Sequence, residues 1–180
     1  MNDVVTKTDG DLRKSIYRVV IRAPIDIVWA EVVRVDQPLP FFFGAKCETP
    51  GLAPGAPIRM RTKSGKYTSV VGDVIAFEPP HLYSHTFRFT TNEDPPCKVT
   101  YELKEVAEGV EFTLTSEFPA SAEVTETEKS MARGSKFIGD NLKAVVETGK
   151  PTFGGGMILA LIRLLEPLTP KQCRSENWPL

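Results

Sequence analysis

The chain has 180 residues, of which 41% are hydrophobic and 25% charged, with a formal net charge of -1. A single domain of this length buries roughly 70% of the surface of its unfolded chain, which is enough for a sizeable core. The balanced and scattered charges argue against nucleic-acid binding, which needs a basic surface.

The polar residues 1–14 lack the apolar core of a secretory signal, and we expect them to form a flexible N-terminus. The three cysteines, Cys47, Cys97 and Cys173, are odd in number and far apart. This spacing argues against a disulfide framework and against a structural zinc site. We therefore expect a cytoplasmic protein without a metal or another cofactor.

Residues 16–23 alternate apolar and polar side chains, which predicts a half-buried strand. Pro24 follows and suits the first position of a helix whose apolar side chains recur at helical spacing up to Val32. The prolines between 36 and 57 forbid long regular elements, and we expect a short helix and a loop there. Three aromatic side chains of this segment are expected to face the interior: Phe41, Phe42 and Phe43.

Alternating hydrophobicity and turn residues predict further strands over 58–62, 66–77, 81–91, 98–104 and 110–118. Pro79 and Pro80 separate the second of these from the third, because proline cannot donate to a sheet ladder. Gly72 lies inside the second strand, where it predicts a bulge or the close approach of another backbone. The last two strands form the clearest hairpin of the chain.

The spacing of the apolar side chains then changes to a helical one, which predicts a long amphipathic helix over 126–148, about 34 Å in length. Thr125 and Glu128 fit a capping box at its start, and Gly149 fits its end. Two glycines inside the helix allow another element to approach closely, or allow a bend. The predicted fold class is α+β, with the helices on one face of a curved antiparallel sheet.

Four short motifs in this order carry a resemblance to a known family. They are Ala23-Pro24-x-x-x-Val28-Trp29, Gly72-x-Val74-x-x-x-x-Pro79-Pro80-x-Leu82, Glu108-Gly109, and Gly134 followed by Asn141-Leu142-Lys143. Residues 15–150 resemble the C-terminal domain of the activator of Hsp90 ATPase homologues, in the START and Bet v 1-like (SRPBCC) superfamily. The resemblance implies a helix-grip fold, with two short helices after the first strand and a cavity under the long helix. Many relatives place Trp directly after the glycine of the last helix, where this chain has Ser135.

Residues 151–180 form a C-terminal extension beyond the usual end of this domain, and residues 157–165 predict a short helix that is apolar nearly all round. The segment is too short to span a bilayer. It can pack on its own domain, which we favour, or form a homodimer with a second copy. We place a membrane surface last, because the helix lacks a strongly polar face. The run Gly154-Gly155-Gly156 predicts a hinge before it.

Aromatic and apolar side chains are candidates for the wall of a ligand cavity, with a few polar groups among them. The predicted ligand-binding residues are Phe41, Phe42, Phe43, Tyr83, His85, Phe87, Tyr101, Phe112, Met131 and Ile138. His85 and Tyr101 are also the candidates for catalysis. His81 and His85 do not predict a shared metal, because four residues along a strand separate them by about 13 Å.

The leading hypothesis is a non-catalytic protein that binds a small hydrophobic or lipid-like molecule. The second is an enzyme of the polyketide cyclase or dehydratase type, which would use polar groups of the same cavity as acid and base. The third is a co-chaperone of Hsp90. We rank it last, because it depends on analogy with the family alone.

Overall fold

The structure is a computed structural model that describes residues 4–120 and 123–180. Its strands form one antiparallel sheet in the order β1-β2-β8-β7-β6-β5-β4-β3. They are β1 (Val5–Asp9), β2 (Leu12–Ile21), β3 (Lys46–Glu48), β4 (Pro57–Arg61), β5 (Thr68–Glu78), β6 (Leu82–Phe89), β7 (Cys97–Val106) and β8 (Gly109–Pro119). The helices are α1 (Ile25–Val32), α2 (Glu126–Thr148) and α3 (Phe153–Leu165). Three short 3-10 helices follow at Glu166–Leu168, Lys171–Cys173 and Ser175–Asn177.

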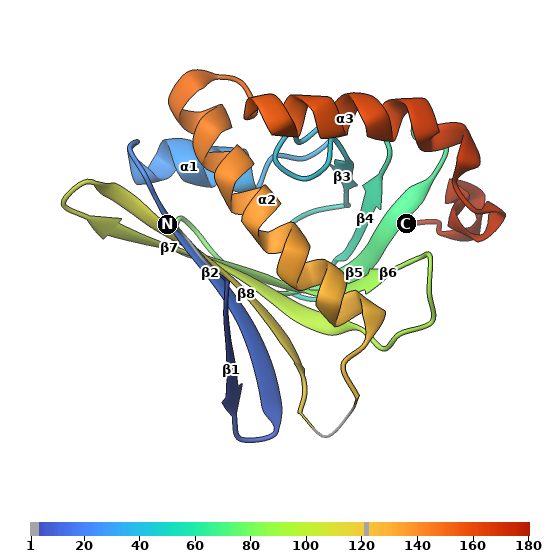
Figure 1. The fold of residues 1–180 in the computed structure, drawn as a ribbon, viewed down its shortest axis with the longest axis horizontal. Helices are drawn as coiled ribbons and strands as arrows, with labels where there is room; N and C mark the ends of the chain where they lie inside the picture. Colours follow the sequence, from blue (N-terminus) through green and yellow to red (C-terminus); the bar gives the residue numbers. More distant parts are fainter. Residues whose placement is uncertain (1–3, 121–122) are drawn as a thin grey trace.

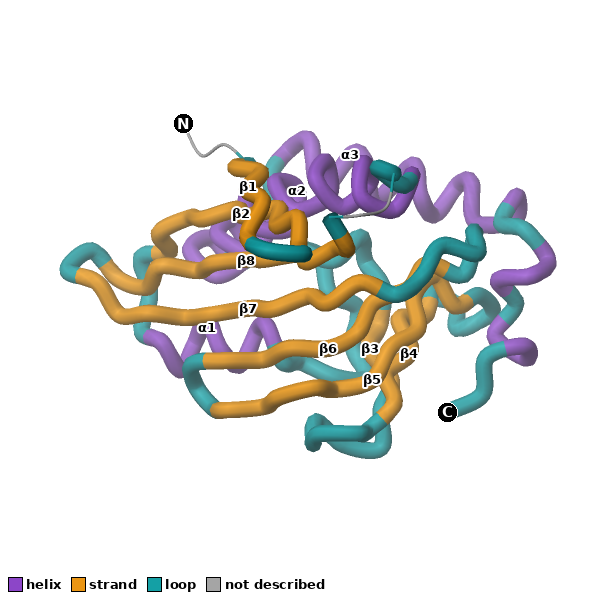
Figure 2. The backbone as a smooth tube through the Cα atoms, turned by 90° about the horizontal axis from the view of Figure 1, so that it is seen from below, coloured by secondary structure: helices purple, strands orange, loops and turns teal. Residues whose placement is uncertain are grey.

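The sheet is curved, and α2 crosses its concave face (Figures 1 and 2). Helix α1 contacts β7, β8 and α2, so it lies on the same face as the long helix. Helix α3 runs across the top of this arrangement in Figure 1. The predicted helix-grip fold of the α+β class is therefore confirmed.

Close backbone contact helps to shape the sheet at Gly72 in β5. A Cβ atom at this position would lie 1.9 Å from the carbonyl oxygen of Thr86 in β6, so only glycine fits. The pairing of β5 with β6 shifts register shortly after this point, between Val74 and Ala76. Such a shift bends a strand and increases its twist. Of the two alternatives predicted for Gly72, a bulge or a close approach, the close approach is confirmed, and the register shift lies farther along β5.

The contact between α2 and β2 is equally close at Gly139. A Cβ atom at Gly139 would lie 2.1 Å from Cε1 of Tyr17, whose ring is completely buried. The Tyr17 hydroxyl donates a hydrogen bond to the carboxylate of Asp140, next to the glycine. The missing side chain therefore lets the helix backbone rest on the Tyr17 ring.

The start of α2 is capped as predicted, but only by half of the capping box. The Thr125 hydroxyl accepts a hydrogen bond from the Glu128 N–H at 3.1 Å. The Glu128 carboxylate instead receives two hydrogen bonds from the Arg13 guanidinium, at 2.9 and 2.8 Å, and so joins α2 to β2. Gly149 ends the helix in the left-handed conformation, with φ of 75°.

Three local predictions are wrong. Residues 5–9 and 12–14 pair as strands, although a flexible N-terminus was predicted over 1–14, of which residues 1–3 lie outside the described residues. Pro24 precedes the first residue of α1 instead of being that residue. The second short helix predicted after the first strand is a turn, in which the N–H groups of Phe42 and Gly44 both bind the carbonyl oxygen of Leu39.

The backbone at this turn explains why no helix forms. Phe43 has a φ of 53° and Gly44 a φ of 72°, and two successive left-handed residues cannot continue a right-handed helix. The turn points neighbouring aromatic rings in different directions. The Phe43 ring stacks on Phe137 of α2, with ring centroids 4.3 Å apart.

We predict opposite effects for two glycine-to-alanine substitutions in α2. Gly139→Ala should lower the free energy of unfolding by about 1–3 kcal/mol, because the new methyl group overlaps the Tyr17 ring. Gly134→Ala should raise it by up to about 1 kcal/mol, since its Cβ would meet Phe43 at an ordinary 3.7 Å and alanine favours helix. Urea unfolding measures both. Equal changes in the free energy of unfolding of the two variants would contradict the close contact between Gly139 and Tyr17.

Candidate functional site

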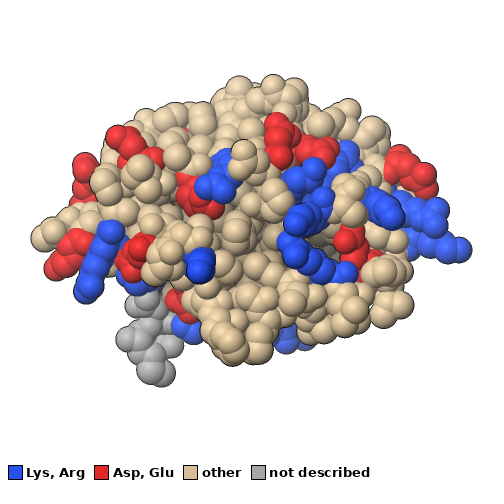
Figure 3. Space-filling view, turned by 90° about the horizontal axis from the view of Figure 1, so that it is seen from above, with Lys and Arg blue, Asp and Glu red and all other residues tan. Residues whose placement is uncertain are grey.

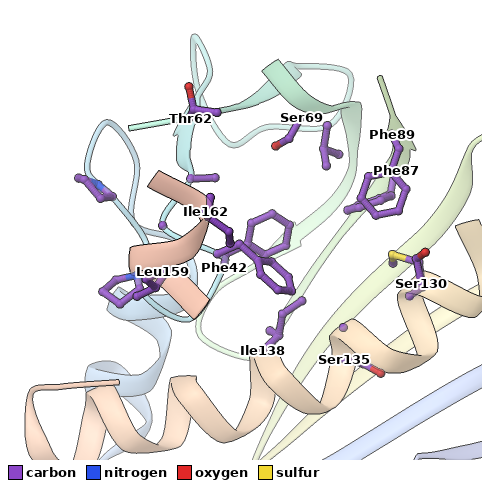
Figure 4. A pocket seen from close by; sticks show the side chains of 18 of the residues that line it. Phe42, Thr62, Ser69, Phe87, Phe89, Ser130, Ser135, Ile138, Leu159 and Ile162 are labelled. Carbon is purple, nitrogen blue, oxygen red and sulfur yellow. The ribbon is translucent and has the colours of Figure 1, made fainter. Parts of the chain in front are cut away.

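A cavity of about 430 Å³ lies between α2, α3 and the sheet. Figure 4 shows Leu159 and Ile162 of α3 on one side of it, Ile138 of α2 below them, and Phe87 of β6 opposite. The turn that contains Phe42 closes a further side. The wall is predominantly apolar.

The position of α3 depends on the corner that joins it to α2. Asn141 of α2 accepts hydrogen bonds from both the N–H and the hydroxyl of Thr152, each at 3.0 Å. A Cβ atom at Gly155 would lie 2.0 Å from the Asn141 side-chain oxygen, so glycine is needed there. The run 154–156 is therefore the first turn of α3, and the predicted hinge is wrong.

The other end of α3 is held by the segment that follows it. The Arg61 guanidinium donates to the Trp178 carbonyl oxygen at 3.2 Å, and the Ser175 N–H donates to the carbonyl oxygen of Lys66 at 2.9 Å. Arg88 lies over the Trp178 ring, 5.1 Å from its centroid. Helix α3 thus packs on its own domain as a lid over the cavity, which is the placement that we favoured.

The outer face of α3 remains apolar and exposed. Phe153 is 86% exposed, Leu161 53% and Leu164 75%. The homodimer expected through this helix stays a prediction. No helix in residues 4–120 and 123–180 is long and apolar enough to cross a membrane.

Six of the predicted ligand-binding residues line this cavity: Phe42, Phe43, Phe87, Tyr101, Met131 and Ile138. Phe41, Tyr83 and His85 line a separate hollow of about 30 Å³, which is room for about one water molecule. Phe42 and Tyr101 line both spaces and so form the boundary between them. Phe112 lines neither, because it is completely buried, with its ring stacked on Tyr101 at 5.9 Å.

The two candidates for catalysis therefore lie in different places. His85 Nδ1 is 2.8 Å from the Thr86 carbonyl oxygen, and burial lowers the pKa of His85 to about 4. The imidazole is neutral at pH 7 and faces the small hollow. Tyr101 lines the cavity, and burial raises the pKa of its hydroxyl, which stays protonated.

The Tyr101 hydroxyl has no hydrogen-bond partner among the residues that the structure describes. Two serine hydroxyls of the cavity wall are already engaged. Ser69 donates to the Met60 carbonyl oxygen at 3.0 Å and Ser135 to the Ala132 carbonyl oxygen at 3.1 Å. Tyr101, which borders both the cavity and the small hollow, therefore keeps a hydroxyl whose hydrogen-bonding capacity the described residues do not use.

Several lining residues were missed by the sequence-based prediction. Those on α3 and its continuation and on the turn between β4 and β5 are Thr62, Lys63, Leu159, Ile162, Arg163 and Glu166. The apolar pattern of 157–165 indicated that this helix would be covered on one face, but not which surface it would cover. Within the described part of the chain, no cluster of His, Cys, Asp or Glu side chains could hold a metal ion.

A family model described as "Activator of Hsp90 ATPase homolog 1-like protein" matches residues 22–147. The chain belongs to this family. The predicted resemblance is therefore confirmed, and α3 lies outside the matched residues. No curated protein matches the chain.

Solved structures share the fold. CalU16 from Micromonospora echinospora is 18% identical, with a TM-score of 0.58 over 89% of this chain and 91% of its own. DynU16, described as a protein in the dynemicin biosynthetic locus, is 23% identical, with a TM-score of 0.61 over 79% of this chain and 49% of its own. Protein MLL2253 from Mesorhizobium loti is 16% identical, with a TM-score of 0.61 over 75% of this chain and 97% of its own.

The buried His85 predicts a pH dependence of stability. Its folded pKa of about 4 lies below the value of about 6.5 in unfolded chains, so the unfolded state binds more protons between these values. The stability from this group is complete above pH 6.5. It should fall by on the order of 3 kcal/mol as the pH drops to 4.

Urea unfolding between pH 7 and 4 measures this effect. His85→Gln should lose stability less steeply than the wild type as the pH falls. His81→Gln, at the turn before β6, is the control. Its free energy of unfolding should change with pH as steeply as that of the wild type, because it retains His85. The same slope in His85→Gln and the wild type would contradict the burial of a neutral imidazole.

Proposed function

We propose that this chain is a cytoplasmic binding protein that holds a small hydrophobic or lipid-like molecule in the cavity under α3. The volume of about 430 Å³ lies within the 300–1,000 Å³ range that is usual for small-molecule sites. Each CH2 group that moves from water into such a site contributes about 0.8 kcal/mol. The apolar wall therefore favours a ligand with a substantial hydrocarbon part.

The observation that carries this proposal is the apolar lining of a cavity of this size. Among its lining residues only Lys63, Arg163 and Glu166 are charged, and these lie on the turn after β4 or at the end of α3 and its continuation. A hydrocarbon chain inside the cavity would be removed from water by apolar side chains of α2, α3 and the sheet, which favours its binding.

The second candidate function is an enzyme of the cyclase or dehydratase type that acts in the same cavity. It is favoured by Tyr101, a residue of the wall whose hydroxyl is protonated and forms no hydrogen bond with the described residues. The structural likeness to DynU16, from a biosynthetic locus, is in keeping with it. Turnover that Tyr101→Phe removes, while ligand binding remains, would support this candidate. The co-chaperone hypothesis depends on the family description alone.

Ser135→Trp tests the binding function, because Ser135 lines the cavity and is 3% exposed. The indole should fill the cavity and weaken the binding of the neutral dye N-phenyl-1-naphthylamine at least tenfold in isothermal titration calorimetry. Arg133→Trp adds the same side chain to the exposed face of α2 and should leave the affinity unchanged.

The outcome also locates the dye. If Ser135→Trp binds the dye as tightly as the wild type, the dye occupies another surface, such as the exposed outer face of α3. That result would contradict the proposed function. Loss of affinity in both variants would indicate a general effect on α2 and would contradict it too.

A further inference from the structure

The cavity has charged residues only at its rim. Among the residues that line it, the charged ones are Lys63, Arg163 and Glu166, and all three come from the turn after β4 or from the end of α3 and its continuation. Lys63 and Arg163 are both exposed. In Figure 3, Lys and Arg side chains gather around a hollow on the face that carries α3.

The two cations have no charged partner in the part of the chain that the structure describes. Within residues 4–120 and 123–180, Lys63 and Arg163 form no ion pair or hydrogen bond with another side chain. The carboxylate of Glu166 is already engaged, because it accepts hydrogen bonds from Thr62, at 2.7 Å, and from the Ser64 hydroxyl. Neutral hydroxyl donors leave this carboxylate charged but hold it in place, so the rim carries two cations and one anion and has a net positive charge.

Glu166 also explains why the two cations lie at the same rim. Its bonds to Thr62 and Ser64 hold the end of α3 against the turn after β4. Lys63 lies between these two hydroxyl residues, and Arg163 lies one helical turn before Glu166. Glu166 is thus a positioning residue for the basic rim.

Building on the proposed function, we propose that the ligand is an anionic amphiphile, with a hydrocarbon body in the cavity and an acidic head group at Lys63 and Arg163. The apolar wall would hold the body, and the two cations would supply charge-assisted hydrogen bonds to a carboxylate or phosphate. A neutral molecule of the same length would gain the burial but not these contacts. Since the rim is exposed to solvent, added salt should weaken the preference.

Two probes of equal chain length separate the contribution of the hydrocarbon body to the affinity from that of the head group. Decanoate and 1-decanol are titrated below their aggregation limits and followed by calorimetry, at low salt and at high salt. The wild type should bind decanoate about tenfold more tightly than decanol at low salt, and this ratio should shrink at high salt.

The double variant Lys63→Met/Arg163→Met keeps the apolar stems and removes both charges. It should bind the two probes with equal affinity. Lys66→Met is the matched control: Lys66 is exposed in the same turn but does not line the cavity, so the preference should remain.

The possible results distinguish this inference from the proposed function. Equal binding of both probes by the wild type would overturn the acidic head group while supporting the apolar cavity as a binding site. A preference that survives in the double variant, or disappears in Lys66→Met, would overturn the role of these two residues. Failure of both probes to bind the wild type would overturn the proposed function itself.

Discussion

The contact between Gly139 of α2 and the Tyr17 ring of β2 determines on which side of α2 the cavity lies. It holds the helix against β2 and β8, where large side chains such as Phe112 are completely buried. Because the sheet curves, the strands on the other side of α2 lie farther from it. The remaining space there, with walls that include Ser69, Phe87 and Ile138, is the cavity. Tight packing on one side of α2 and a void on the other are therefore two consequences of one helix position.

Helix α3 completes this arrangement although it lies outside the residues that match the family. It touches the cavity mainly through Leu159 and Ile162 and is anchored at its two ends, by Asn141 and by the hydroxyl groups around Glu166. A lid held at its ends and lightly packed between them can open locally at a low free energy. The same lid supplies Arg163, so closing the cavity and presenting a positive charge at its rim are coupled.

Much of the fold follows from local sequence patterns. The alternation in 110–118 and the helical period in 126–148 specify which side chains are buried, and Thr125 and Gly149 mark the helix ends. The turn at Phe43 was mispredicted, because no local pattern indicates the positive φ of this residue, whose ring stacks on Phe137 of α2. The cavity wall was predicted in part for a related reason. Alternation places Tyr83, His85 and Phe87 on one face of β6, but it does not show which of these side chains border the large cavity and which border the small hollow. Only the three-dimensional packing, with Phe42 and Tyr101 as the boundary, separates the small hollow from the cavity.

The most direct test is to locate a bound hydrocarbon chain by nuclear magnetic resonance. Intermolecular nuclear Overhauser effects can be measured between 13C-labelled decanoate and the methyl groups of the protein. The account predicts contacts to Met131, Ile138 and Ile162, which line the cavity. Contacts confined to Leu161 and Leu164, on the exposed face of α3, would contradict it, because the chain would then bind outside the fold rather than within it.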